Sequence, residues 1–336
     1  MWPEGFDPAR LTPDASLNKL VIGRAPGAQP AHFGQNGGDL LGRDAVVRLV
    51  QQRCGVDVRR DAVSDWLVAQ IAADRAEGAA GVVDEVGDRL ASLVATLRDP
   101  ATAVTATGRR RTYLEVWPSL GEVILGGGLM KGVAGERVAA RAGAVLEARE
   151  VDPPAVRVAR HPEWLGLLGA ARSASGRDAR VVVFDGGQTS IKRGIALIHD
   201  EGLASVRVLA PLPVTSIPRC GLSGVVARAA MALTAHHRGA PPEVIFSVAS
   251  YLDGGRPVPD HTSIYGQLDP PSMQSRFGLH VRLIHDGSAA WRGTDTDTRS
   301  AVIMLGTWLG VGIGPHSEPL RSYSASFTIE TDGTGA

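Results

Sequence analysis

The sequence predicts an α/β fold with two domains and mixed β-sheets, and three observations support this prediction. Short apolar runs typical of buried strands alternate with longer segments in which apolar residues recur at helical spacing. Several of the apolar runs end in glycine-rich turns, which mark where strands stop. The chain has 336 residues, enough for two domains, and 44% of them are hydrophobic, enough for ordinary globular cores.

The predicted elements can be placed by residue range. We expect strands at 122–125, 155–159, 244–248, 281–284, 302–305 and 311–313, with three more strand-like runs within 180–211. Helical spacing predicts helices within 42–100 and at 133–147, 164–173 and 222–237. We expect residues 1–42 to be rich in loops, and residues 102–113 to form an exposed insertion.

The charge and cysteine content argue against several classes of protein. Lys and Arg equal Asp and Glu at 35 each, so no net field indicates nucleic acid or an anionic membrane as a partner. Two cysteines, Cys54 and Cys220, are too few for a disulfide framework or a cysteine zinc cluster. There is no apolar stretch of about 20 residues and no signal-peptide pattern at the start. We therefore expect a cytoplasmic protein that binds neither nucleic acid nor membrane.

The most informative segment is the turn that follows the apolar run 181–184. It reads Asp185-Gly-Gly-Gln-Thr189-Ser-Ile-Lys192, and a second strand begins at Gly194. A tight glycine-rich turn presents backbone N–H groups to an anion, and an Asp at the end of a strand can hold a hydrated Mg²⁺. This combination predicts a site for nucleotide phosphates. Lys192 is either a phosphate contact or an exposed strand residue, and we favour the second interpretation.

Three other segments share this layout of a buried strand that ends in a polar, glycine-rich turn. They are His285-Asp286-Gly-Ser-Ala-Ala, Leu305-Gly306-Thr307-Trp308-Leu-Gly310-Val-Gly312-Ile-Gly314 and Ile124-Leu-Gly126-Gly-Gly128. Each segment alone is typical of an ordinary turn. Four of them in one chain are harder to explain as unrelated turns, and they favour a shared role in phosphate chemistry.

Together, the four segments resemble the motifs of the ROK-family sugar kinases, within the actin/hexokinase superfamily. That family carries an Asp-x-Gly-Gly-Thr phosphate turn, an Asn-Asp-Ala-Asn-Ala-Ala segment with the catalytic Asp, a Gly-Thr-Gly-Ile-Gly-Gly-Gly turn and a late Leu-Gly-Gly-Gly adenosine motif. The resemblance covers roughly residues 34–315 and includes Gly166-Leu-Leu-Gly-Ala170-Ala, which is similar to the family's closing helix. It implies an actin-like (ribonuclease H-like) ATPase fold, with two α/β domains and a central cleft.

The order of the motifs differs from that of the family, because the adenosine motif comes first here. The resemblance therefore implies a circular permutation. The family's usual C-terminal domain would occupy residues 1–175, its usual N-terminal domain 179–300, and residues 301–336 would begin the second domain and pair with 1–175. Residues 175–178 would be the joining linker. Such relinking is physically tolerated, because the termini of compact domains lie at the surface and often close together.

The resemblance also implies an activity, ATP-dependent phosphorylation of a hydroxyl of a sugar, amino sugar or cyclitol, with Mg²⁺. Asp286 would be the general base, although an Asp here can also cap the following helix, and Asp185 would hold Mg²⁺ through water. The other cofactor-binding residues would be Gly186, Gly187, Gln188, Thr189, Lys192, Gly306 and Thr307 around the phosphates, and Gly126, Gly127 and Gly128 at the adenosine.

Several positions depart from the family's pattern or concern its substrate. His285 replaces an Asn, and it could orient a substrate hydroxyl or be an ordinary structural His. Trp308 takes a normally small position, where it could stack on the substrate or narrow the site. Asp253 lies in the loop after strand 244–248 and is a further substrate candidate. The family's zinc-loop cysteines and its Glu-x-Gly-His element are not visible, so we expect no zinc, and Asn18 is only a poor substitute.

Two other functions remain open at this point. Trp308 and the missing sugar-binding His favour a catalytically weak or inactive pseudokinase that binds a sugar or a nucleotide. The family also includes sugar-responsive repressors, and residues 45–50 with 62–67 have helix-turn-helix-like spacing, but the basic surface of a DNA reader is absent. In the leading interpretation the partner is a small-molecule substrate, and a homodimer is compatible with the sequence.

Overall fold

The computed structural model describes residues 2–25, 28–73, 77–104, 106–149, 152–176, 179–217, 221–234, 243–258 and 264–331. The protein is a mixed α/β protein whose two larger sheets contain parallel strands. The chain divides into two compact units. Unit 1 comprises Met1–Glu163 with Thr296–Pro315, and unit 2 comprises Trp164–Asp295 with His316–Ala336.

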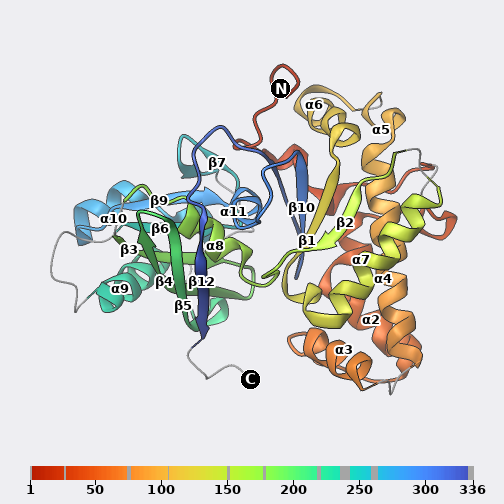
Figure 1. The fold of residues 1–336 in the computed structure, drawn as a ribbon, viewed down its shortest axis with the longest axis horizontal. Helices are drawn as coiled ribbons and strands as arrows, with labels where there is room; N and C mark the ends of the chain where they lie inside the picture. The colour runs from red at the N-terminus through yellow and green to blue at the C-terminus, as the bar shows by residue number, and fades with distance from the viewer. Residues whose placement is uncertain are drawn as a thin grey trace. The chain divides into compact units, whose positions relative to one another are not determined.

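The sheet of unit 2 has six strands in the order β12-β5-β4-β3-β6-β9 (Figure 1). The strands are β3 (Ala179–Gly186), β4 (Ser190–His199), β5 (Gly202–Pro213), β6 (Val244–Val248), β9 (Val281–His285) and β12 (Tyr323–Thr331). β3, β4 and β5 form an antiparallel meander. β6 and β9 run parallel to β3, and β12 runs parallel to β5. The carboxyl ends of β3, β6 and β9 therefore meet at one edge of the sheet.

Helices cover both faces of this sheet, because successive strand residues point to opposite sides. Phe184 and Phe246 pack into a core with α9 (Leu222–Thr234) and α10 (Pro270–Phe277). Val183 and Ile245 pack into the opposite core with α8 (Leu165–Arg172) and α11 (Asp286–Arg292). Shorter elements of unit 2 are η6 (Val214–Ser216), η8 (Ile264–Gln267), β7 (Leu252–Asp253) and β8 (Arg256–Pro257).

Two glycines bring α8 and α11 into backbone contact. A Cβ added to Gly169 of α8 would stand 1.7 Å from the carbonyl oxygen of Ala289 in α11. A Cβ on Gly293, just after α11, would stand 2.3 Å from the carbonyl oxygen of Leu165. Neither site can accommodate a side chain without moving a backbone, so these glycines determine how close the two helices lie.

Unit 1 contains a four-stranded sheet in the order β11-β10-β1-β2 (Figure 1). Its strands are β1 (Glu122–Gly126), β2 (Ala155–Val158), β10 (Ser300–Leu305) and β11 (Leu309–Gly314). β1 runs parallel to both β2 and β10, whereas β10 and β11 form an antiparallel hairpin. Leu125 pairs with Ile303, so two segments far apart in the chain share the centre of this sheet.

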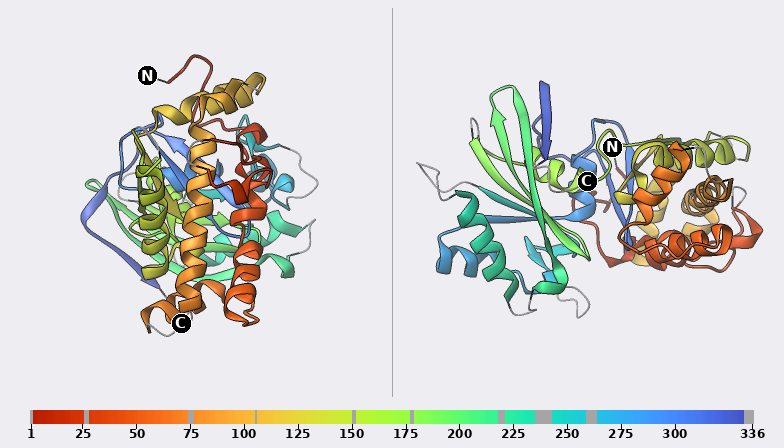
Figure 2. Two further views of the ribbon diagram at one scale, coloured as in Figure 1. Left: turned by 90° about the vertical axis from the view of Figure 1, so that its right-hand side faces the viewer. Right: turned by 90° about the horizontal axis from the view of Figure 1, so that it is seen from below.

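The long helix α4 (Glu77–Arg98) lies between α2 (Arg43–Cys54) and α7 (Gly132–Glu147), as Figure 2 (left) shows. Leu90, Leu93 and Val94 of α4 are fully buried. The other helices of unit 1 are α1 (Gly37–Leu41), α3 (Val63–Ala72), α5 (Pro100–Val104) and α6 (Gly108–Val116), with 3₁₀ turns at Pro13–Ala15, Leu17–Lys19, Pro30–His32, Trp117–Ser119 and Gly128–Met130. No helix in the described part of the chain is both long and apolar enough to cross a bilayer.

The expected domain borders need two corrections. The first unit ends at Glu163 rather than at residue 175, because α8 buries Leu167 and Leu168 against the sheet of unit 2. Residues 301–336 do not stay together: β10 and β11 join β1, whereas β12 returns to unit 2 and pairs with β5. Ser175, expected in a linker, hydrogen-bonds to Glu243 within unit 2, and residues 177–178 lie outside the described residues.

Three local features were not predicted. The described residues of 102–113 are mostly exposed or half-buried, as expected, but they lie largely in α5 and α6, and Tyr113 at the end is buried with its ring edge to face on Trp117. The helix α1 and the strand β12 were not expected. β12 could have been predicted, because Tyr323, Ala325, Phe327 and Ile329 alternate with polar residues, a pattern typical of a strand with one buried face.

We expect Gly169→Ala to destabilise unit 2 strongly. The new Cβ would meet a backbone carbonyl that cannot rotate away, so the loss in free energy of unfolding should reach or exceed about 3 kcal/mol, the upper end for overpacking. Gly143→Ala in α7 is the matched control, because a Cβ there meets only Val156 at 4.0 Å. It should stabilise the protein by up to about 1 kcal/mol. Equal stability of the two variants in urea unfolding would contradict the helix contact.

Candidate functional site

Two carboxylates lie at the edge of unit 2 where β3, β6 and β9 end. Asp185 is in register with Ser247 of β6, and the Ser247 hydroxyl donates a hydrogen bond to Asp185 Oδ1 at 3.2 Å. Asp286 follows β9 directly and begins α11. Val248 of β6 is in register with both Gly186 of β3 and His285 of β9, so the two carboxylates stand at the same end of the sheet on the strands that flank β6, and the charge of Asp185 contributes to raising the pKa of Asp286. The structure thus brings these two predicted residues together.

The charge of Asp185 is balanced by Lys192, which pairs with it across the β3–β4 hairpin. The Lys192 ammonium lies 3.6 Å from Asp185 Oδ2 and 5.5 Å from the centre of the Trp164 ring. The Lys192 side chain is 30% exposed. The favoured interpretation of Lys192 as an exposed strand residue is therefore wrong: it is a partly buried counter-charge to a site carboxylate.

A glycine at the start of α8 allows the helix to approach Asp185. A Cβ on Gly166 would stand 2.3 Å from Asp185 Oδ1 and 2.4 Å from its carboxyl carbon. Gly166 therefore leaves the space that the Asp185 side chain occupies. The sequence signal was present, since Gly166 begins the Gly-Leu-Leu-Gly-Ala-Ala segment, but no contact with Asp185 was expected from it.

The described residues supply hydrogen-bond partners for only one of the two carboxylate oxygens of Asp286. Its Oδ1 accepts a hydrogen bond from the backbone N–H of Gly287 at 2.7 Å and lies 3.2 Å from His285 Nε2, while the side chain is 33% exposed. Its Oδ2 has no hydrogen-bond partner among the described residues. Burial raises the pKa of Asp286 most, and the charge of Asp185 raises it further, against the opposing effects of His285 and the Gly287 N–H. A carboxylate with one uncommitted oxygen can accept a proton there.

His285 lies between Asp286 and the ring of Tyr251. It is 8% exposed, and it stacks on Tyr251 with ring centroids 4.9 Å apart. Burial lowers the pKa of His285, so the imidazole is neutral near pH 7. Its Nδ1 is buried and has no hydrogen-bond partner among the residues described. Tyr251 was not predicted as a site residue, because no sequence pattern connects it with His285, which lies at the end of the following long strand, β9.

The turn between β3 and β4 is fixed by Tyr265. The Tyr265 hydroxyl donates to the Gly187 carbonyl at 2.7 Å, and the Gly187 N–H donates to Ser190 at 3.0 Å. A Cβ on Gly186 would stand 2.6 Å from the Tyr265 ring, so only glycine fits there. Gln188 and Thr189 at the tip are exposed. Tyr265 was not predicted as a site residue, because its 3₁₀ turn falls in none of the expected elements.

The two glycine-rich turns of unit 1 lie side by side. Gly126 ends β1 in register with Met304, and a Cβ on Gly127 (φ +94°) would stand 2.2 Å from the carbonyl oxygen of Leu305. Gly127 is thus required for the contact between the turns. The Gly306 carbonyl accepts a hydrogen bond from the backbone N–H of Arg43 at 2.9 Å, which brings the start of α2 to the same place. Thr307 lies in this turn and is partly exposed.

Trp308 and Asn18 meet in unit 1. Trp308 is 54% exposed, and its ring lies 3.3 Å from where a Cβ on Gly38 would stand. Asn18 pairs with the backbone of Leu309 through two hydrogen bonds of 2.8 Å. Asn18 therefore anchors the β10–β11 hairpin, and its amide is occupied by the backbone rather than open to a sugar.

The remaining predicted residue, Asp253, is not brought to the carboxylates by any described contact. It lies exposed in the two-residue strand β7, opposite Arg256 of β8. The helix-turn-helix spacing is not matched either, because residues 55–62 separate α2 from α3, whereas the DNA-binding motif has a turn of about three to four residues.

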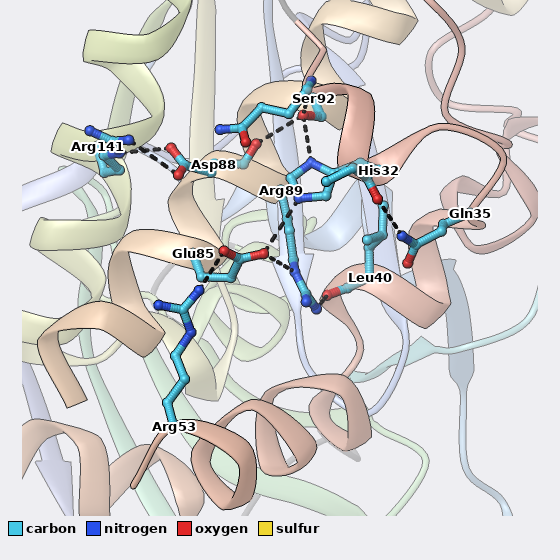
Figure 3. Close-up of polar contacts among 11 residues, drawn as sticks. His32, Gln35, Leu40, Arg53, Glu85, Asp88, Arg89, Ser92 and Arg141 are labelled. Carbon is cyan, nitrogen blue, oxygen red and sulfur yellow. Dashed lines mark hydrogen bonds and ion pairs between the residues drawn. The ribbon is translucent and has the colours of Figure 1, made fainter. Parts of the chain in front are cut away.

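A polar cluster in unit 1 places Ser92, His32 and Glu85 in contact (Figure 3). The His32 ring lies 2.8 Å from Ser92 Oγ and 3.4 Å from Glu85 Oε1, and Glu85 is also bound by Arg53 and Arg89. These are the residue types of a nucleophile, a base and an acid. Ser92 is completely buried, however, and also hydrogen-bonds to the Asp88 carbonyl, so no substrate can reach it. The cluster instead holds residues 29–32 against α4.

Comparison with protein families and with curated proteins found no match. No protein-family model matches the chain, and no curated protein is significantly similar to it. Among the described residues, no group of three or more His, Cys, Asp or Glu side chains is arranged to hold a metal ion. A functional assignment therefore depends on the carboxylate edge of unit 2 and on the glycine turns of unit 1.

We expect Asp286→Asn to be more stable than the wild type at neutral pH. The raised pKa of Asp286 means that the folded state keeps this proton to higher pH than the unfolded chain, so folding loses stability as pH rises above about 4. The amide retains the Gly287 hydrogen bond and carries no charge. The advantage of the variant in thermal unfolding should grow from pH 4 to pH 8. An advantage that is absent at pH 8, or equal at both pH values, would contradict this account.

Proposed function

We propose that this protein is an ATP-dependent phosphotransferase that acts on a hydroxyl of a sugar, amino sugar or cyclitol, with an actin-like fold whose two halves are joined in permuted order. The observation that supports this most is the pair Asp185 and Asp286 at one sheet edge. One carboxylate has a counter-charge and the other keeps a free oxygen. Phosphoryl transfer needs a group that positions charge and a group that accepts the hydroxyl proton.

Asp286 is the general base in this proposal. Its Oδ2 has no partner among the described residues and its pKa is raised, which brings the base closer to the pH at which it works. The neutral ring of His285 beside it, stacked on Tyr251, places Nε2 at 3.2 Å from Asp286 Oδ1 and so orients the carboxylate. Asp286 would take the proton at Oδ2 as the hydroxyl oxygen forms a bond to the γ-phosphorus of ATP, while the bond from that phosphorus to the β–γ bridging oxygen breaks and ADP leaves.

Asp185 and Ser247 suit a hydrated Mg²⁺. In phosphoryl-transfer sites Mg²⁺ is usually held by one or two carboxylates, several waters and the substrate's own phosphates, so a cage of three protein ligands is not required. When bound, Mg²⁺ would neutralise phosphate charge. Ser247 holds Asp185 Oδ1 in place at 3.2 Å, and Gly166 leaves room for the carboxylate.

The glycine turns support a nucleotide as the phosphate donor. In unit 2, Tyr265 fixes the Gly186–Gly187 turn, while Gln188 and Thr189 remain exposed for contact with phosphates. In unit 1, Gly126 to Gly128 lie against the turn with Gly306 and Thr307, where bare backbone allows close approach of a ligand. Both turns follow the ends of buried strands.

Incubation with ATP, Mg²⁺ and a panel of sugars, amino sugars and cyclitols tests the proposal directly. We expect transfer of the γ-phosphate to at least one acceptor. Asp286→Ala should lower kcat by about 10²- to 10⁴-fold, because the proton acceptor is lost. Asp200→Asn, in the exposed turn after β4, is the charge-matched control and should leave kcat within about twofold. An Asp286→Ala variant as active as the wild type would refute the assignment of the base.

A nucleotide-binding protein without transferase activity is the second candidate, and one observation favours it. Lys192 lies 3.6 Å from Asp185 and competes with a metal ion for the same carboxylate. The same panel decides between the two candidates. ATP binding in calorimetry, with no phosphorylated product from any acceptor, would support the binding protein.

A further inference from the structure

Arg43 places a cation between the two glycine turns of unit 1. It is the first residue of α2, and its backbone N–H donates to the Gly306 carbonyl at 2.9 Å. One terminal nitrogen of its guanidinium lies 3.5 Å from where a Cβ on Gly128 would stand. The side chain thus reaches the 126–128 turn, while the backbone is fixed to the 305–307 turn.

This guanidinium has no counter-charge of its own. Among the described residues it forms no ion pair and no side-chain hydrogen bond, and its Nε is fully buried and unpartnered. The nearby carboxylates are already paired, Asp44 with Arg60 at 2.8 Å and Asp61 with Arg59 at 2.6 Å. A half-buried cation without a partner is costly, so an anion that binds there gains the interaction that the protein does not supply.

The Arg43 guanidinium keeps its charge although it is half-buried. Burial lowers the pKa of Arg43 most, and the positive charge of Arg60 lowers it further, with Asp61 and Asp44 offsetting part of this. An Arg side chain nevertheless stays protonated in proteins, so the charge persists. Arg is also suited to phosphate in particular, because its planar fork donates two parallel hydrogen bonds to two oxygens.

We propose that Arg43 is an anion-binding residue that holds a phosphate group of a nucleoside polyphosphate in unit 1, between the 126–128 turn and the 305–307 turn. The identification of the ligand as a nucleotide rests on the proposed function, whereas the binding of a polyphosphate anion does not. Arg43 was not among the residues expected from the sequence. It stands outside all four glycine-rich motifs, and only the folded contacts bring it to them.

Calorimetry with the full chain tests this, with sodium tripolyphosphate and ATP titrated separately into the wild type, Arg43→Gln and Arg48→Gln. Arg48 is the matched control, because it is exposed on the same helix and its loss changes the net charge equally. We expect Arg43→Gln to weaken both ligands by at least about tenfold, the effect of one lost charged hydrogen bond. Arg48→Gln should change either affinity by less than about twofold.

Thermal unfolding gives an independent measurement. Tripolyphosphate should raise the Tm of the wild type and of Arg48→Gln, and it should raise the Tm of Arg43→Gln much less. Without ligand, Arg43→Gln should unfold at the same or a higher temperature than the wild type, because it removes an unpaired half-buried charge. This comparison also shows that the variant is folded.

The outcomes separate this proposal from the kinase. If tripolyphosphate binding depends on Arg43 but the protein phosphorylates no acceptor, the anion site is supported and the proposed kinase activity is refuted. An active kinase whose Arg43→Gln variant binds ATP and tripolyphosphate like the wild type would overturn the anion site alone. A wild type that binds neither ligand would overturn it as well.

Discussion

The backbone contact between α8 and α11 is the constraint on which the carboxylate edge depends. Gly169 lies against the Ala289 carbonyl and Gly293 against that of Leu165, so neither helix can shift without the other. α11 begins with Asp286, and α8 brings Gly166 against Asp185. The positions of both carboxylates therefore follow from two places where a side chain cannot fit. A loosened helix pair would disturb both at once.

The two carboxylates have unlike surroundings, and the difference gives them different chemistry. Asp185 has a cation, Lys192, and a hydroxyl donor, Ser247, so its negative charge is well compensated. Asp286 has a backbone N–H and a neutral imidazole, and its pKa is raised by burial and by Asp185. A raised pKa suits Asp286 to accepting a proton, whereas the cation and the hydroxyl donor suit Asp185 to holding charge in place. The stability lost at Asp286 is consistent with a group kept for function.

The sequence predicted most of the regular structure that depends on local patterning. β6 was placed at its exact bounds, and β1, β9 and α7 to within one residue, because each combines an uninterrupted apolar pattern with a clear turn or glycine signal. The prediction missed two local features. Tyr113 stands at the end of a largely exposed or half-buried segment but is buried, with its ring edge to face on Trp117. The strand β12 pairs with β5 at the edge of the sheet, and the alternation of its apolar and polar residues was a signal that the prediction did not use.

The sequence by itself determined which residues of the turns are candidate site residues. Asp185, Asp286 and the glycines stand in segments whose strand–turn pattern can be recognised without the structure. Only the tertiary structure decided what surrounds them. Lys192, Ser247, Tyr265, Gly166 and Arg43 reach the turns through strand register, helix packing and backbone hydrogen bonds. The physical reason is that charge balance, burial and pKa depend on neighbours in space, and spacing along the chain carries no record of them.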